Sequence, residues 1–266
     1  MKKVYFSSLI KEKFSEDFEA IKNSLEKHGI FYEFINNTKD IWCRDYMPVK
    51  VSENEYVQFR YEPDYLKGYE YLQTNPLELH RELDINPKIS EINIDGGNVV
   101  KHKNKVLMTD KIFKENPEID KSILIEKLKE LLKVDEIVIV PKQPYDMYGH
   151  TDGMLRFIDD NTLLVNDISI ESESYINKLF KTLEKHNLDF VQITYPESFL
   201  RKHEWGAYLN FIEIDDIIFM PVYGMEEDKY TVDFIETIFE DKTVEPVKIP
   251  HIIKDGGALH CISWMK

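Results

Sequence analysis

The chain ends with Asp255-Gly256-Gly257-Ala258-Leu259-His260-Cys261-Ile262-Ser263-Trp264. In this stretch two glycines come before Cys261, and an alternating apolar segment follows it. The pattern predicts a nucleophilic thiol at the start of a strand, because glycine lets the backbone approach a ligand closely. A lone buried cysteine is more commonly a small apolar filler. The catalytic hypothesis therefore depends on polar groups elsewhere in the chain.

Three polar clusters interrupt otherwise apolar sequence and supply such groups. They are Trp42-Cys43-Arg44-Asp45, Asp95-Gly96-Gly97-Asn98 and Gly149-His150-Thr151-Asp152. Together with Cys261 they provide a thiol, an imidazole and three carboxylates. This set of groups is sufficient for covalent catalysis with proton transfer.

Each cluster also has a purely structural interpretation. The two Asp-Gly-Gly segments are typical of turns, and Asp152-Gly153 is typical of a hairpin turn. Asp45 could simply form an ion pair with Arg44. If His150 and Asp152 lie on a strand, their side chains share one face because they are two residues apart.

A regular spacing links these positions. Asp45, Asp95, Asp152, Asn210 and Cys261 follow one another at intervals of 50, 57, 58 and 51 residues, and each follows or opens a pair of predicted strands. Such a period is typical of folds that repeat one supersecondary unit. In a closed ring the equivalent strand ends meet at one axis, so distant residues can line one pocket. The sequence thus predicts an α/β fold of five units in one domain, residues 1–266.

The local patterns predict alternating helices and strands. Apolar residues recur at helical spacing in Glu16–Lys27, Ser122–Leu132, Tyr175–His186 and Lys229–Phe239. Apolar and β-branched runs predict strands at residues 3–10, Val134–Val140 and Met154–Ile158, among others. Pro48 places the segment Trp42–Val49 on a loop or a sheet edge.

The composition is that of an acidic globular protein. Of 266 residues, 42% are apolar, and 49 acidic against 34 basic residues give a net charge of −15. This balance disfavours nucleic acid and anionic membranes as partners and weakly favours a cationic ligand. Two cysteines far apart in the sequence form no disulfide framework, and Cys43 is predicted to be structural. Without a signal-peptide pattern or an apolar run of roughly 18 residues, a cytoplasmic protein is expected.

The motifs together resemble those of agmatine deiminases and the related bacterial peptidylarginine deiminases. Residues 42–48 resemble the W-x-R-D-x-x-P element of that family, and residues 95–98 resemble its E-G-G-N element. Residues 149–157 are similar to G-H-x-D-x-x-x-R-F, residues 207–211 to S-Y-x-N-F, and residues 256–262 to G-G-x-x-H-C-I. The motifs occur in order from about residue 40 to the C-terminus, so they are jointly specific.

The resemblance implies the guanidino-group modifying superfamily and its pentein fold, a five-bladed α/β propeller with the active site on the pseudo-symmetry axis. By match of motif, Cys261 would be the nucleophile, His150 the general acid/base, and Asp95 the carboxylate that orients His150. Substrate contacts would come from Asp45, Asp152, Trp42 and Arg156.

The activity that the resemblance implies is hydrolytic deimination of a small cationic guanidino substrate. Agmatine is the first candidate, giving N-carbamoylputrescine and ammonia through a thiouronium on the cysteine. No metal or organic cofactor is needed. A homo-oligomer is left open.

Two features depart from the family pattern. Asp95 stands where most members carry Glu, which is one methylene longer, so either an inward shift of the chain or a bridging water to His150 is expected. The chain also stops at Lys266, where relatives continue, which leaves the loops around the substrate tail in doubt.

Several alternatives remain at this stage. Peptidylarginine and free arginine are other substrates, with Arg44, Arg156 and Arg201 as candidates to hold a carboxylate. Related amidinotransferases use Asp at the position of Asp95, so transfer to an amine is an alternative to hydrolysis. An inactive guanidinium binder is a further one. The last is a metal site with the ligands His150, Asp152, His251 and His260, although neither H-E-x-x-H nor a Cys-rich cluster is present.

Overall fold

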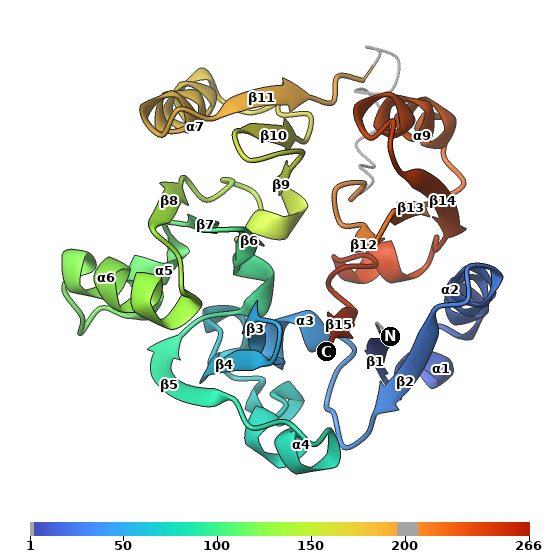
Figure 1. The fold of residues 1–266 in the computed structure, drawn as a ribbon, viewed down its shortest axis with the longest axis horizontal. Helices are drawn as coiled ribbons and strands as arrows, with labels where there is room; N and C mark the ends of the chain where they lie inside the picture. Colours follow the sequence, from blue (N-terminus) through green and yellow to red (C-terminus); the bar gives the residue numbers. More distant parts are fainter. Residues whose placement is uncertain (1–2, 196–206) are drawn as a thin grey trace.

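The computed structural model describes residues 3–195 and 207–266. Its strands form five three-stranded sheets, which Figure 1 shows set around a ring as blades. The first blade contains β15 (Ser263–Met265), β1 (Lys3–Ser7) and β2 (Phe31–Ile35). The second contains β3 (Val49–Ser52), β4 (Glu55–Arg60) and β5 (Lys88–Asn93). The third contains β6 (Val100–His102), β7 (Lys105–Thr109) and β8 (Glu136–Val140). The fourth contains β9 (Leu155–Phe157), β10 (Thr162–Val165) and β11 (Asp189–Gln192), and the fifth β12 (Ile212–Ile214), β13 (Ile217–Val222) and β14 (Thr243–Lys248).

All five blades repeat one pairing pattern. The middle strand pairs antiparallel with the first strand of its blade and parallel with the third. Parallel neighbours need a crossover connection, and helices provide it. These are α1 (Ile10–Lys13) and α2 (Ser15–Lys27), then η1 (Asp64–Leu66), η2 (Glu70–Leu72) and α4 (Pro76–Glu82), then α5 (Lys111–Glu115) and α6 (Lys121–Leu132), then α7 (Glu173–Lys185), and finally α9 (Glu227–Ile238). The predicted α/β ring of five units is confirmed.

The two ends of the chain close the ring in one blade. β15 pairs antiparallel with β1, with Tyr5 opposite Trp264, and Figure 1 shows both termini there. The buried indole of Trp264 donates to the carbonyl of Pro48 at 2.8 Å. The C-terminal motif is therefore fixed between the first and second blades.

A short turn leads into the first strand of each blade, on the inner side of the ring in Figure 1. In the second, third and fourth blades these turns are α3 (Cys43–Tyr46), η3 (Gly96–Asn98) and η4 (Thr151–Gly153). The five regularly spaced residues that the sequence singled out lie in or next to these five turns. They are Asp45, Asp95, Asp152, Asn210 and Cys261. The period therefore marks the point where the chain enters each blade.

The segment Trp42–Val49 forms the short turn α3 and meets the edge strand β3 at Val49, in agreement with the predicted loop or sheet edge. The turns correct two other local predictions. The first predicted strand, residues 3–10, ends at Ser7, and α1 begins at Ile10. His150 and Asp152 do not share a strand face. The amide of Met154 bonds the carbonyl of Thr151 at 2.9 Å, which closes a helical turn instead.

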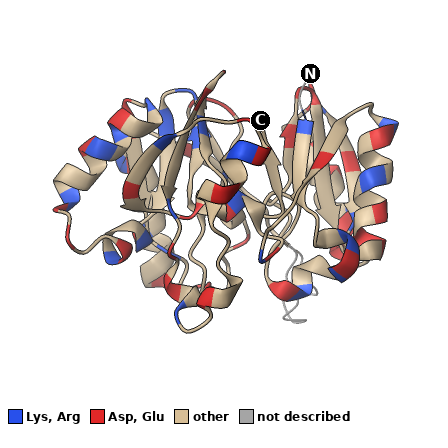
Figure 2. Ribbon diagram, turned by 90° about the horizontal axis from the view of Figure 1, so that it is seen from below, with Lys and Arg blue, Asp and Glu red and all other residues tan. Residues whose placement is uncertain are grey.

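Charged residues lie mostly outside the buried core. Figure 2 shows acidic and basic positions interspersed along the peripheral helices. The largest buried apolar cluster joins the first and fifth blades. Among the described residues, no helix has both the length and the apolar character needed to span a bilayer.

Candidate active site

Cys261 lies in the turn before β15 and is 9% exposed. The side-chain oxygen of Asn210 accepts the amides of Cys261 at 3.0 Å and Ala258 at 3.2 Å, so the fifth blade fixes this turn. The thiol donates to Asp152 Oδ2 at 3.8 Å. Burial, with Asp152 and Asp45 nearby, raises the pKa of Cys261 well above its usual value. In the free protein the sulfur is a neutral thiol.

Two small cavities meet at Cys261. One of about 30 Å³ is lined by Trp42, Asp45, Tyr65, Tyr148, His150, Asp255, Gly256 and Cys261. The other, of about 170 Å³, is lined by Asp152 and also by His150, Tyr148, Gly256 and Cys261, among others. The thiol and the imidazole border both cavities, and each cavity has one of the two predicted substrate carboxylates in its wall.

His150 is held between two carboxylates. Its Nε2 lies 3.0 Å from Asp95 Oδ2, and its Nδ1 lies 3.6 Å from Asp45 Oδ1. Burial disfavours the imidazolium, but Asp45 and Asp95 outweigh this effect and raise the pKa of His150 to about 9. The contact with Asp95 is direct, so the shorter side chain reaches the ring without a bridging water.

The close approach of Asp45 and His150 requires glycine at position 97. The amide of Gly97 donates to Asp45 Oδ1 at 3.0 Å. A Cβ atom on Gly97 would lie 2.7 Å from that oxygen and 2.8 Å from His150 Nδ1. Burial raises the pKa of Asp45 to about 6, with the charge of His150 opposing the shift.

Asp152 is oriented by a second histidine. Its Oδ2 lies 2.6 Å from Nδ1 of His260. Burial raises the pKa of Asp152, but the bond from His260 and the charges of His150 and Arg44 lower it overall. Burial, Arg44 and Arg156 lower the pKa of His260 to about 3, so its neutral ring donates to the carboxylate. Sequence reasoning missed this role, although His260 adjoins Cys261 in the motif.

Asp95 has a second partner that the sequence did not indicate. The ammonium of Lys111, at the start of α5, contacts the same Oδ2 that faces His150. Lys111 also lies 2.9 Å from Glu115 on the next turn of α5. Burial opposes the ionised form of Asp95, but His150 and Lys111 lower its pKa below the usual value.

The remaining predicted residues differ in their placement. Trp42 lines the smaller cavity and packs against Gly257, where a Cβ atom would lie 2.5 Å from the indole. Arg156 lines neither cavity. Its guanidinium donates to the Phe211 carbonyl at 3.2 Å and stacks on the Phe211 ring, so the predicted direct contact with substrate does not match this position. Arg201 lies outside the described residues.

Cys43 and His251 line neither cavity and bond to groups elsewhere in the fold. Cys43 is fully buried and donates to the Ile262 carbonyl at 2.9 Å, and burial raises the pKa of its thiol despite Arg44. His251 pairs with Asp17 of α2 at 2.7 Å, rather than with the other histidines of the metal alternative. Within residues 3–195 and 207–266, no three His, Cys, Asp or Glu side chains are arranged to hold a metal ion.

The ring of five three-stranded blades, entered through inward turns, defines the pentein class of α/β propellers. Comparison with solved structures agrees with this class. The structure aligns with C. jejuni agmatine deiminase, in a cysteine-to-serine variant with substrate bound, at a TM-score of 0.76 and 18% identity over 99% of this chain and 92% of that one. It aligns with DDAH from Pseudomonas aeruginosa at a TM-score of 0.61 and 11% identity, over 99% and 98% of the two chains.

Sequence comparison identifies the family. The chain belongs to the Porphyromonas-type peptidyl-arginine deiminase family, whose pattern matches residues 9–266. A relative from Enterococcus faecalis, assigned as an agmatine deiminase, is 22% identical over 93% of this chain and 80% of its own length.

Proposed function

We propose that this protein hydrolyses the guanidino group of agmatine to N-carbamoylputrescine and ammonia. One observation carries the proposal. Cys261 and His150 border two cavities whose walls hold the buried carboxylates of Asp45 and Asp152. A guanidinium is a planar cation with several N–H donors, and two carboxylates can hold its edges while its carbon faces the sulfur.

Substrate binding activates the nucleophile. Burial and, after it, the carboxylates of Asp152 and Asp45 raise the pKa of Cys261 in the free protein. A bound cation compensates the charge of the carboxylates and adds a positive charge next to the sulfur, which lowers the pKa, so the thiol proton leaves to solvent as substrate enters. The thiolate then attacks the guanidinium carbon and forms a neutral tetrahedral adduct.

His150 transfers protons in both halves of the reaction. As imidazolium it protonates one amino group of the adduct, ammonia leaves, and a thiouronium on Cys261 remains. The neutral imidazole then takes a proton from water, and the hydroxide adds to the same carbon. The carbon–sulfur bond breaks, the sulfur takes up the product's remaining proton, and the urea-type product departs.

The lining of the cavities favours agmatine over free arginine. None of the described residues that line them is Lys or Arg, whereas Asp45, Asp146, Asp152 and Asp255 are all acidic. Agmatine carries an ammonium at the end opposite the guanidinium. At that end arginine carries both an ammonium and a carboxylate. Arg44 and Arg156, the two described candidates for that carboxylate, do not border either cavity.

Ammonia release tests this proposal. The purified protein is incubated with agmatine, arginine and an arginyl peptide, with Cys261→Ala as the control, and each is repeated with an added amine to detect a transferred amidino group. We expect ammonia from agmatine above the other two, and no new guanidino product. No ammonia from any of the three, with Cys261 reduced, would contradict deimination.

A further inference from the structure

We propose that Lys111 is a positioning residue for the proposed deimination, which acts by fixing the Asp95 carboxylate and limiting how tightly it holds the proton of His150. The effect of Lys111 on turnover rests on the proposed function, whereas its effect on Asp95 and His150 concerns the free protein alone. Lys111 lies in none of the sequence motifs and does not border the cavities.

The geometry joins four charges in a row. Nζ of Lys111 contacts Glu115 Oε1 and Asp95 Oδ2, and Asp95 Oδ2 in turn lies 3.0 Å from Nε2 of His150. From Glu115 to His150 the groups are a carboxyl, an ammonium, a carboxylate and an imidazolium. Burial and the charge of Asp95 raise the pKa of Glu115 to about 7, so Glu115 is ionised at the higher pH where His150 titrates. Two cations thus share a single oxygen of Asp95.

The ion pair between Lys111 and Asp95 is buried away from water. Its side chain is 2% exposed and Asp95's is fully buried, so water cannot replace either partner. The ammonium also lies 5.0 Å from the centre of the Tyr65 ring, which borders the smaller cavity. Losing one member of a buried ion pair leaves the other charge uncompensated.

The shared oxygen sets the orientation of Asp95. Oδ1 of Asp95 is buried without a hydrogen-bond partner among the described residues, so only Oδ2 is engaged. Without Lys111 the whole charge of the carboxylate would act on His150, and the carboxylate could rotate. A more basic His150 is a poorer acid toward departing ammonia, so turnover would slow.

Other groups facing His150 contribute to its basicity and do not change in the test. The charged and titratable side chains around it, besides Asp95 and Lys111, are Asp45, Asp146, Asp152, Tyr65, Tyr148 and Cys261. Burial and Lys111 are the influences that lower the pKa of His150, against Asp45 and Asp95, which raise it.

The test is an NMR titration of the His150 ring in the free protein, assigned with His150→Asn. In Lys111→Met we expect the pKa of His150 to rise by about one unit, because the repulsion from the ammonium is gone. In Glu115→Gln we expect a smaller shift downward, because a negative charge is removed. Lys111→Arg should stay near the parent. For agmatine, kcat of Lys111→Met should fall about tenfold with KM within about twofold.

A matched control is Lys101→Met, which removes a partly buried ammonium that bonds the Val51 carbonyl rather than Asp95. It should leave the titration unchanged. An unchanged or lowered pKa in folded Lys111→Met overturns the proposal. If that variant does not fold, Glu115→Gln decides, and an unchanged or raised pKa there overturns it. Since the titration uses no substrate, it stands even if agmatine is not turned over.

Discussion

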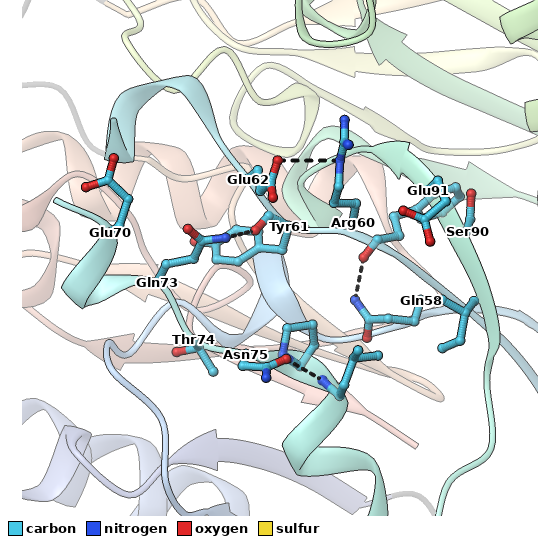
Figure 3. A pocket seen from close by; sticks show the side chains of 14 residues that line it. Gln58, Arg60, Tyr61, Glu62, Glu70, Gln73, Thr74, Asn75, Ser90 and Glu91 are labelled. Atoms are coloured by element: carbon cyan, nitrogen blue, oxygen red, sulfur yellow. Dashed lines mark hydrogen bonds and ion pairs between the residues drawn. The ribbon is translucent and has the colours of Figure 1, made fainter. Parts of the chain in front are cut away.

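The groove on the second blade is larger than the cavities at the centre of the ring, about 320 Å³ against about 30 and 170 Å³, yet its polar groups are arranged quite differently (Figure 3). In the groove Arg60 pairs with Glu62, Gln73 bonds the Tyr61 carbonyl, and Asn75 caps α4. The side chains of Arg60 and Glu62 are 36% and 61% exposed. Such exposed pairs contribute little free energy.

The centre of the ring concentrates titratable groups whose pKa values are displaced by burial and by neighbouring charges. Asp45, Asp95, Asp152, His150 and Cys261 are all less than a tenth exposed, and each has a displaced pKa with a named partner. Displaced pKa values among paired charges in a cavity are typical of functional sites. The two regions therefore differ in the desolvation of their paired charges, and the larger volume belongs to the region without it.

Replacing the nucleophile gives the largest expected effect. Cys261→Ala should lower kcat for agmatine by more than about 10⁴-fold, because no other group can form the covalent intermediate. Steady-state ammonia release measures it. Cys43→Ala is the matched control, since it removes the same atom from the core and should change stability but not the activity of the folded protein. Equal losses in both variants would refute the assignment.

Removing one carboxylate at the centre should have the next largest effect. Asp152→Asn should lower kcat/KM by about 10²- to 10³-fold, because a charged contact to the guanidinium is lost. The same change in the groove, Glu91→Gln, should leave kcat/KM within about twofold. A comparable loss from both substitutions would show that the two regions do not differ as described.

A methyl group at the centre should act through crowding. Gly97→Ala should lower kcat/KM by about 10- to 100-fold, because the added atom meets both Asp45 and His150. Gly153→Ala is the comparison in the neighbouring turn, where a Cβ atom would have nothing within 4 Å although the position borders the larger cavity. If Gly97→Ala retained full activity, the close approach of these two groups would not matter.

The smallest expected effect is an increase, in the rate at which Cys261 is alkylated. Burial raises the pKa of Cys261, and Asp152 raises it further and accepts a hydrogen bond from the thiol. Asp152→Asn should therefore speed alkylation of Cys261 by iodoacetamide at pH 7.5, by about tenfold. In the parent the rate should rise with pH above 7, as the thiolate fraction grows. Slower alkylation in Asp152→Asn would contradict the electrostatic account of the thiol.

The sequence contained the repeat and most of the central groups. Five spaced residues predicted the blades because each marks the entry to one first strand, and Asp95 and His150 could be placed together from their motifs. Lys111 could not be found, since it lies in none of the motifs and its burial and its contact with Asp95 depend on how α5 packs. For Arg156 the motif shows which residue recurs but not which way its side chain points, and its guanidinium lies on the Phe211 ring. The same limit concealed the bond between His260 and Asp152.

In the proposed reaction the sulfur of Cys261 becomes bonded to the guanidino carbon of the substrate. Rapid acid quenching of the protein with agmatine, followed by peptide mass spectrometry, measures this bond directly. The account predicts that the peptide containing Cys261 gains the mass of agmatine less that of ammonia, and that Cys43 stays unmodified. Turnover with no adduct on Cys261, or an adduct on another residue, would contradict it.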